Sequence, residues 1–413
     1  MTRRVILIAF HFPPMQGSSG LLRTLSFARH LPEFGWEPLV LTAHPRAYAE
    51  TSAHQVADIP EDLVVSRAFA LDSARHLAVR GRYPGLLATP DRWWSWWLGG
   101  VPAGLRLARR WGARAIWSTA PIATAHLIAL TIRRVTGLPW VADIRDLLTE
   151  PNEPAHPAAW RATHRIESRT LLTSDRVVVA SPGQRTEYHR RFPTLPDGRI
   201  EVIPNGFDEG YFRDAECATP PARPRDRLLL VHSGVLYPDG RNPEPFFRAV
   251  SRLIGAGEIG REELEIRLRA SGSEKRYGAA IRELGLESTV RLMPPLDYRD
   301  ALAELLGADG LLLFQGLGTG TAIPAKLYEY FRAGRPILAL TEPGGATARA
   351  LGDAGYTRMA PLESAEAIAG ALRAFLDDLR QHEGFGLPVE EARRYSRRNG
   401  CRRLAGVLDE VIS

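Results

Sequence analysis

Cysteine is almost absent from this sequence of 413 residues, which contains only Cys217 and Cys401. Two widely separated cysteines exclude a disulfide framework and a cysteine-based metal site, and they favour a reducing, cytoplasmic location. Long apolar runs are also missing, because no stretch reaches the 18 residues of a membrane-spanning helix. The apolar run over residues 1–10 is too short for a signal peptide with its cleavage site, and we expect it to belong to the fold.

Several motifs that mark other enzyme classes are missing too. The patterns G-x-x-x-x-G-K-[ST] and H-E-x-x-H do not occur, which disfavours P-loop nucleotide hydrolysis and zinc peptidase chemistry. No G-x-G-x-x-G follows the first expected strand, which disfavours a dinucleotide-dependent dehydrogenase. We therefore expect neither a bound metal nor a cofactor.

Lysine is as scarce as cysteine, since Lys275 and Lys326 are the only lysines among 53 basic residues. The net charge of +6 comes from arginines spread along helices that also carry Asp and Glu, so we expect no nucleic-acid partner. The arginine-rich helix around 105–110 could contact anionic lipid headgroups at the inner face of the cell membrane, or it could be a solvated helix face. The tryptophans of residues 93–97 likewise fit either a membrane interface or core packing.

The first half of the chain alternates between apolar strands and amphipathic helices. Continuous apolar runs are typical of parallel strands buried on both faces, and this alternation predicts a doubly wound α/β sheet. The expected strands are 5–10, 37–43, 63–69, 115–119, 140–144, 176–181 and 201–204, with helices at 21–31, 123–136 and 158–172.

A proline-rich stretch at 217–226 interrupts this alternation and predicts a linker. The same alternation then restarts, which predicts a second α/β domain. Its expected strands are 228–233, 264–269, 290–293, 310–314 and 336–340, with helices at 245–254, 277–284, 298–306 and 325–332.

The most informative segment is residues 323–337, which follow an apolar strand and a glycine-rich loop. Pro324 suits a first helical turn, where free backbone N–H groups attract anions. Lys326 adds a positive charge there, and Glu329 lies one turn further on, where a carboxylate can accept hydrogen bonds from sugar hydroxyls. A diphosphate attached to a ribose would satisfy all three features, although a capped surface helix with an incidental lysine is the simpler alternative.

Other stretches place polar groups after expected strands, where ligands bind in open α/β sheets. Glycine there lets the backbone approach a phosphate closely, and arginine can bind phosphate through two hydrogen bonds. Each stretch also has a structural alternative: a plain tight turn for the glycines and serines, a solvent-exposed loop for Arg241, and an Arg–Asp pair that closes the strand at 140–144. These positions are Gly17, Ser18, Ser19 and Gly20 after the first strand, Asp143, Arg145 and Asp146 at the end of the strand at 140–144, and Gly234 and Arg241 after the strand at 228–233.

In order and spacing, these motifs resemble the retaining glycosyltransferases of family 4 (group 1), which have the GT-B fold. The likeness covers residues 4 to about 355. It is carried by residues 323–337 together with Phe12-Pro13-Pro14, Ser118-Thr119-Ala120-Pro121, His126-Leu127-Ile128, Pro139-Trp140-Val141-Ala142-Asp143-Ile144-Arg145-Asp146 and Val202-Ile203-Pro204-Asn205-Gly206-Phe207-Asp208.

The resemblance implies two doubly wound Rossmann-like domains that face each other across a cleft. It predicts an acceptor-side domain at 1–210, a linker at 211–226, a donor-binding domain at 227–385 and a C-terminal helix at 386–413 that crosses back onto the first domain. The donor would be a nucleotide diphosphate sugar, and the acceptor a glycan or lipid-linked intermediate of polysaccharide biosynthesis. Without a D-x-D motif, the metal-dependent class of glycosyltransferases is disfavoured.

The resemblance also assigns roles to the residues. Lys326 and Arg241 would hold the diphosphate and act in catalysis, Glu329 the ribose, and Gly17 to Gly20 and Gly234 would lie against the donor. Arg145 and Asp146 would serve catalysis on the acceptor side beside Asp143. Many members carry a glutamate where this chain has Thr321, so Thr321, Ala322 and Ile323 would contribute backbone N–H groups instead. An epimerase of the same fold and a catalytically silent binding subunit remain alternatives.

Overall fold

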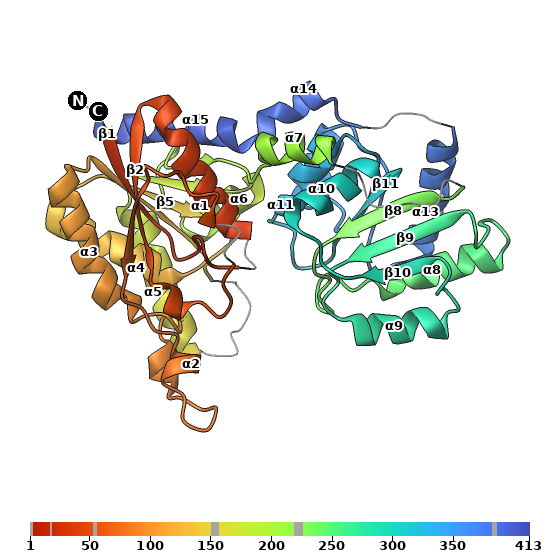
Figure 1. Ribbon diagram of the computed structural model, residues 1–413, viewed down its shortest axis with the longest axis horizontal. Helices are drawn as coiled ribbons and strands as arrows, with labels where there is room; N and C mark the ends of the chain where they lie inside the picture. The colour runs from red at the N-terminus through yellow and green to blue at the C-terminus, as the bar shows by residue number, and fades with distance from the viewer. Residues whose placement is uncertain (1–2, 17–18, 53–55, 150–156, 219–225, 382–385) are drawn as a thin grey trace. The chain divides into compact units, whose positions relative to one another are not determined.

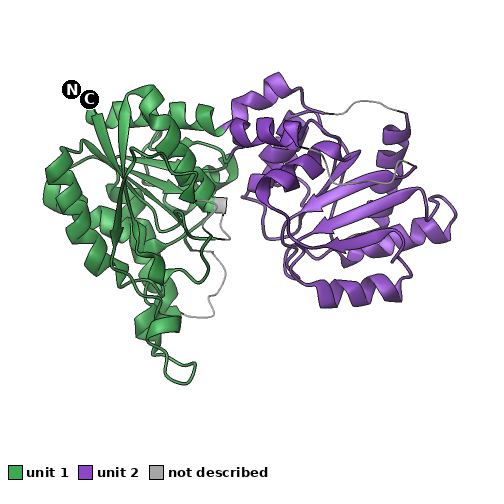
Figure 2. Cartoon of the chain, viewed as in Figure 1, with its two compact units in different colours: residues 1–205, 397–413 green, residues 206–396 purple. Residues whose placement is uncertain are grey.

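The computed structural model describes residues 3–16, 19–52, 56–149, 157–218, 226–381 and 386–413. The chain divides into two compact units (Figure 2). Unit 1 comprises Met1–Asn205 and Arg397–Ser413, and unit 2 comprises Gly206–Ser396. Within the described part of the chain, no helix has both the length and the apolar character needed to cross a membrane.

Unit 1 is built on a seven-stranded parallel sheet (Figure 1). The strands run in the order β3-β2-β1-β4-β5-β6-β7, so the connection reverses direction between β1 and β4. The side chains of Val5 to Ile8 are fully buried, as expected for a central strand covered on both faces. The strands are β1 (Arg3–Ile8), β2 (Trp36–Ala43), β3 (Val64–Ala68), β4 (Ala115–Thr119), β5 (Trp140–Ile144), β6 (Arg176–Val179) and β7 (Ile200–Val202).

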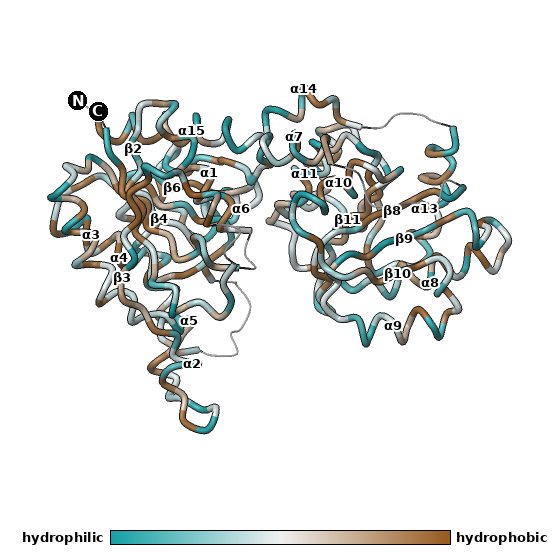
Figure 3. Tube along the Cα trace, in the orientation of Figure 1, coloured by the Kyte–Doolittle hydropathy of each residue, from teal (hydrophilic) through white to brown (hydrophobic). Residues whose placement is uncertain are grey.

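Helices cover this sheet and complete its apolar core, which is brown in the tube of Figure 3. Gly112 and Gly137 end two of them in the left-handed conformation that glycine adopts without strain. The helices of unit 1 are α1 (Ser19–His30), α2 (Ser73–His76), α3 (Trp96–Trp111), α4 (Ala123–Thr136), α5 (Pro157–Thr173), α6 (Pro182–Arg191) and α15 (Arg397–Ile412), with short 3-10 turns at Leu31–Phe34, Pro45–Ala47 and Gly85–Ala88.

Unit 2 repeats this plan with six parallel strands in the order β10-β9-β8-β11-β12-β13. Its connection reverses direction between β8 and β11. The two doubly wound sheets confirm the predicted fold class. The strands are β8 (Leu228–Ser233), β9 (Leu264–Arg269), β10 (Val290–Met293), β11 (Gly310–Gln315), β12 (Ile337–Thr341) and β13 (Met359–Ala360).

The helices of unit 2 include three that the sequence did not predict. These three are α7, α12 and α13. The helices are α7 (Glu209–Cys217), α8 (Glu244–Gly255), α9 (Glu274–Glu283), α10 (Tyr298–Gly307), α11 (Ala325–Ala333), α12 (Ala346–Asp353), α13 (Ala365–Arg380) and α14 (Val389–Ala392), with a 3-10 turn at Arg393–Tyr395.

The predicted linker at 211–226 differs from the structure at its beginning. Helix α7 occupies most of the first half of that range, and its Tyr211 and Phe212 are buried in the core of unit 2. Arg332 in α11 pairs with Glu209 and Glu216 of α7, at 2.7 and 2.8 Å. The apolar side of α7 therefore makes it part of the domain, whereas residues 219–225 lie outside the described part.

The expected C-terminal helix at 386–413 is two helices in the structure. Helix α14 belongs to unit 2, and only α15 packs in unit 1, where it contacts α1. Leu404 and Leu408 of α15 are buried with Phe27, and the indole of Trp36 donates a hydrogen bond of 2.8 Å to Asp409.

The tryptophans of residues 93–97 belong to the core of unit 1. Trp96 is fully buried beside Phe10, and Trp93 and Trp97 pack against the same cluster. Trp94 is half-buried. Of the two interpretations of these tryptophans, core packing is the one that the structure shows.

Candidate active site

The best-defined site lies in unit 2, where the sheet reverses direction between β8 and β11. Ligands of doubly wound sheets bind beyond the carboxyl ends of the strands at this point, because the two connections leave in opposite directions. Gly234 and Arg241 follow β8, whereas Gln315 ends β11 and leads through residues 316–324 into α11. These loops touch, since the N–H of Gly316 donates to the carbonyl of Gly240 at 2.7 Å.

Lys326 is held at the start of α11 and reaches back to the end of β8. Its Nζ lies 3.2 Å from Nε2 of His232, a fully buried side chain. Two features disfavour a side chain at Gly234. Its φ of +115° disfavours any side chain, and a Cβ would lie 2.8 Å from the ammonium of Lys326.

Burial lowers the pKa of both members of this pair. It lowers the pKa of Lys326 to about 7, assisted by the nearby positive charge of Arg241 and opposed by Glu329. Burial, and then the neighbouring Lys326, hold the pKa of His232 well below its usual range. The ring is therefore neutral, with Nδ1 2.8 Å from the carbonyl oxygen of Leu312. A cation whose pKa is this depressed gains most from an incoming anion.

Arg241 lies on the loop that follows β8. Its Nε donates to Oε1 of Gln315 at 3.1 Å, and its guanidinium carbon lies 5.7 Å from the ring centre of Tyr237. Gln315 is buried, so this bond fixes the arginine relative to the end of β11. Arg241 and Lys326 approach the point where the sheet reverses from opposite sides, close enough for the charge of Arg241 to lower the pKa of Lys326.

Glu329 lies one helical turn beyond Lys326 and is half-buried. Its Oε1 accepts a hydrogen bond of 2.6 Å from the hydroxyl of Tyr298, the first residue of α10. One carboxylate oxygen is thereby oriented, and a carboxylate has further acceptor sites for two adjacent hydroxyls.

The loop of Thr321, Ala322 and Ile323 has fewer free backbone N–H groups for a ligand than the sequence indicated. The N–H of Ala322 donates to the carbonyl of Thr319 at 2.9 Å, so it serves the loop itself. Ile323 is buried in the core of unit 2. Thr321 is half-buried. The backbone N–H of Ala322, which was expected to donate to the bound ligand, therefore donates within the loop instead.

Two side chains near this loop were not predicted to be functional. His232 lies inside an apolar strand, where a histidine is ordinarily a core residue. Glu342 follows β12, and its Oε2 lies 2.9 Å from where a Cβ of Gly320 would stand. That oxygen is buried and has no hydrogen-bond partner among the described residues. Neither position carries a local sequence signal, because each depends on neighbours distant in the chain.

In unit 1, Arg145 contacts segments that follow three neighbouring strands. It follows β5 itself, and its guanidinium donates hydrogen bonds to the carbonyl of Ala120, which follows β4, from Nε at 3.2 Å and from Nη2 at 2.5 Å. The guanidinium also lies against Gly20, in the first turn of α1. A Cβ on Gly20 would stand 2.3 Å from Nη1 of Arg145, so a larger residue there would require the guanidinium to move. Arg145 also lowers the pKa of His11, which burial depresses first, to about 4.

Asp143 and Asp146 differ sharply. Asp143 is fully buried and pairs with Arg23 of α1 through contacts of 2.8 and 3.2 Å. Arg23 also donates to the carbonyls of Ile203 and Pro204, at 3.0 and 2.9 Å. Asp143 therefore fixes α1 to the end of β5 as part of an Arg–Asp ion pair. Asp146 is exposed.

The glycine and serine stretch that was predicted after the first strand is only partly described. Gly17 and Ser18 lie outside the described residues, and Ser19 begins α1.

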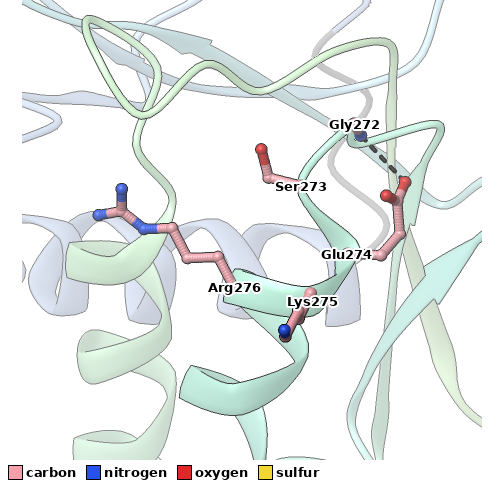
Figure 4. A pocket seen from close by; sticks show the side chains of 5 residues that line it. All are labelled: Gly272, Ser273, Glu274, Lys275 and Arg276. Carbon is pink, nitrogen blue, oxygen red and sulfur yellow. Dashed lines mark hydrogen bonds between the residues drawn. The ribbon is translucent and has the colours of Figure 1, made fainter.

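A separate shallow pocket in unit 2 is lined by residues 272–276 at the start of α9 (Figure 4). Here the N–H of Gly272 donates to Glu274 at 3.0 Å, and Lys275 is exposed. This pocket follows β9, which neighbours β8, so it shares the sheet edge of the Lys326 site.

The two doubly wound sheets define a class of fold, the GT-B fold of two-domain glycosyltransferases. Residues 22–206 match the family model described as a glycosyl transferase 4-like domain. The chain is 23% identical to D-inositol 3-phosphate glycosyltransferase from Corynebacterium aurimucosum, over 99% of this chain and 96% of that protein. Along its whole length the protein is therefore similar to glycosyltransferases of group 1 (family 4), and the family model itself matches residues 22–206.

Solved structures agree in fold. Sucrose-phosphate synthase from Thermosynechococcus elongatus superposes with a TM-score of 0.71 at 15% identity, covering 99% of this chain and 98% of that chain. HepE from Anabaena, solved in complex with UDP-glucose, gives 0.67 at 14% identity over 98% and 99%. WaaG, a glycosyltransferase involved in lipopolysaccharide biosynthesis, gives 0.64 at 14% identity over 98% and 99%.

Proposed function

We propose that this glycosyltransferase moves a sugar from a nucleotide diphosphate sugar to a hydroxyl of a lipid-linked glycan, with retention of configuration. The observation that carries the donor assignment is the convergence of Lys326, Arg241 and Glu329 at one point of unit 2. Two cations suit a diphosphate, and an oriented carboxylate one turn away suits a ribose. The UDP-glucose bound by HepE supports a uridine nucleotide as the first donor to test.

The proposed chemistry needs few protein groups. The acceptor oxygen forms a bond to the anomeric carbon, and the bond from that carbon to the diphosphate oxygen breaks on the same face. The diphosphate leaves with the bonding electron pair and takes the proton of the acceptor hydroxyl. Lys326 and Arg241 stabilise the negative charge that develops on the leaving group, so the reaction would proceed without a metal ion.

Arg145 would act on the acceptor side. Its buried guanidinium and the N-terminus of α1 create a positive environment in unit 1. The relative from Corynebacterium acts on an inositol phosphate, which supports an acceptor that carries a phosphate. The role of WaaG in lipopolysaccharide biosynthesis supports a lipid-linked acceptor in polysaccharide assembly. Such an acceptor would place the enzyme at the cytoplasmic face of the membrane.

Calorimetry with nucleoside diphosphates and their sugars tests the donor assignment directly. We expect wild-type protein to bind UDP or another nucleoside diphosphate, and Lys326→Met to bind it at least tenfold more weakly, the loss of about one charged hydrogen bond. NMR of the product would then give its anomeric configuration. Sugar conversion without any acceptor would instead identify an epimerase, and donor binding without turnover a binding subunit.

A further inference from the structure

A short arm of unit 1, residues 77–88, exposes apolar side chains beside arginines. It follows α2 and projects from the unit in Figure 1. Val79 and Leu86 are 76% and 80% exposed, the highest values for large apolar side chains among the described residues. The arm has no part in either site described above.

The tip of the arm is a tight turn. The backbones of Val79 and Arg82 exchange hydrogen bonds of 2.8 and 3.1 Å, and the two residues between them, Arg80 and Gly81, are left-handed with φ of +53° and +74°. This is the geometry of a two-residue hairpin turn. This hydrogen-bonded turn lies between Val79 and Leu86. Both apolar side chains therefore project from a segment with a defined backbone conformation.

The base of the arm is fixed to unit 1. The N–H of Ser73 donates to the carbonyl of Arg92 at 2.9 Å, which joins the two ends of the arm. The hydroxyl of Thr163 in α5 donates to the carbonyl of Pro90 at 3.2 Å. The exposure of Val79 and Leu86 is therefore a property of an anchored protrusion, and ordering it on a partner costs little conformational entropy.

The charge of the arm selects the partner. Residues 73–90 contain three arginines and no Asp or Glu. Arg80 and Arg82 are exposed on either side of Gly81, between the two apolar side chains. Figure 3 shows the same alternation of apolar and hydrophilic residues along the arm. An anionic lipid surface offers both complements, phosphates for the arginines and acyl chains for Val79 and Leu86.

Other partners fit less well. A second copy of this chain would bring like charges together, because the protein carries a net charge of +6. Single-stranded nucleic acid is bound by stacking aromatic side chains, and the exposed apolar groups here are aliphatic. We propose that residues 77–88 dock the enzyme reversibly on an anionic bilayer by inserting Val79 and Leu86 between headgroups that Arg80 and Arg82 bind. This proposal rests on the lipid-linked acceptor proposed above.

Cosedimentation of the full chain with vesicles tests it. The vesicles are phosphatidylcholine alone or mixed with phosphatidylglycerol, at low and high salt. We expect wild-type protein to pellet only with the anionic vesicles and less so at high salt. In the double variant Val79→Ser/Leu86→Ser the partition coefficient should fall by about tenfold or more, since two apolar insertions are lost. Arg80→Asn/Arg82→Gln should remove the salt dependence, and asparagine tolerates the left-handed turn.

Matched controls come from unit 1 itself. Val135 and Leu172 are 58% and 51% exposed on α4 and α5, and Val135→Ser/Leu172→Ser should pellet like wild type. Wild-type protein that stays in the supernatant overturns the proposal, as does an equal loss in the control variant. Self-association that the Val79 and Leu86 substitutions abolish, seen by sedimentation velocity without vesicles, would also overturn it in favour of a second copy.

A soluble acceptor analogue separates this inference from the proposed function. Sugar transfer to the soluble analogue without vesicle binding would sink the arm proposal and leave the transferase assignment intact. Vesicle binding through the arm without any sugar transfer would support the arm and contradict the proposed reaction.

Discussion

The ammonium of Lys326 lies 3.2 Å from Nε2 of His232, which is 94 residues earlier in the chain. Nδ1 of the ring lies 2.8 Å from the carbonyl oxygen of Leu312, and Nε2 also lies 3.1 Å from the carbonyl oxygen of Gly234, so two backbone carbonyls fix the neutral imidazole beside the lysine. A histidine inside a strand thus orients a lysine at a helix start. The pair would also link the proposed donor binding to pH, since the pKa of Lys326 is about 7.

The first prediction concerns the pH dependence of diphosphate affinity. Lys326 is charged below about pH 7 and loses its proton above it, whereas a bound diphosphate favours the charged form. The affinity for UDP should therefore fall as the pH rises above 7, by at most about tenfold per pH unit. Calorimetry in buffers of different ionisation enthalpy should show that binding takes up a proton near pH 8.

Lys326→Arg is the control for this linkage. A guanidinium remains charged throughout this range, so the variant should bind UDP without proton uptake and with little pH dependence. Binding by wild-type protein that is independent of both buffer and pH would contradict the link to Lys326, while leaving the donor assignment itself in place.

The second prediction is that Lys326→Met stabilises the protein. The folded-state pKa of Lys326 is depressed, so its protonation favours the unfolded state. At pH 7 the variant should gain on the order of 2 kcal/mol in free energy of unfolding. The gain should be complete below about pH 7 and should vanish as the pH rises towards the ordinary lysine pKa of about 10.4. Denaturation at pH 6.5 and 9.5 checks this, and an equal gain at both values would contradict it.

The third prediction assigns Glu329 to the ribose. Glu329→Ala should weaken UDP binding by about tenfold and leave binding of inorganic diphosphate unchanged, since only the nucleotide carries the hydroxyls. Tyr298→Phe removes the 2.6 Å hydrogen bond and keeps the carboxylate, so its loss should be smaller. The two affinities are measured by competition against a fluorescent nucleotide. Parallel losses for UDP and inorganic diphosphate in Glu329→Ala would place the carboxylate elsewhere.

The sequence predicts the sheets well because their strands are buried on both faces. Residues 311–313 of β11 and 338–340 of β12 are nearly unbroken apolar runs, and every described side chain in them is buried. Helix α6 has the opposite character. Its sequence, Pro182–Arg191, is mostly polar and offers no apolar periodicity, so it was not predicted. The two-residue strand β13 is too short to leave a pattern.

The candidate site likewise has a part that the sequence predicts and a part that only the structure shows. Lys326 and Glu329 are one turn apart on α11, so their shared face follows from helical spacing. The partners of those residues come from tertiary structure. No local pattern shows that His232 faces Lys326, that Gln315 holds Arg241, or that the carboxylate of Asp143 is already paired with Arg23.

The fourth prediction is that turnover survives a metal chelator. Lys326 and Arg241 can supply the positive charge that metal-dependent transferases take from a divalent cation. The rate measured with excess EDTA should equal the rate without it, and added magnesium or manganese should not raise it. Turnover that disappears with EDTA and returns with either metal would show that these two side chains are insufficient.

The last prediction concerns Gly20, the first-turn residue of α1 that lies against Arg145. In Gly20→Ala the new methyl group would stand 2.3 Å from Nη1 of a buried guanidinium that is tied to the carbonyl of Ala120. The arginine must move, so transfer should fall by about tenfold or more, because small misplacements of binding groups are costly. Stability should fall by roughly 1–3 kcal/mol, as for other overpacked sites.

Gly406 provides the matched control. It lies within α15, is exposed, and has no atom within 4 Å of the position that a Cβ would take. Gly406→Ala should therefore raise stability by about 0.5–1 kcal/mol through helix propensity and leave transfer unchanged. UDP binding in unit 2 should be the same in both variants. If Gly20→Ala transfers sugar at the wild-type rate, Arg145 does not act on the acceptor from the position that the structure gives it.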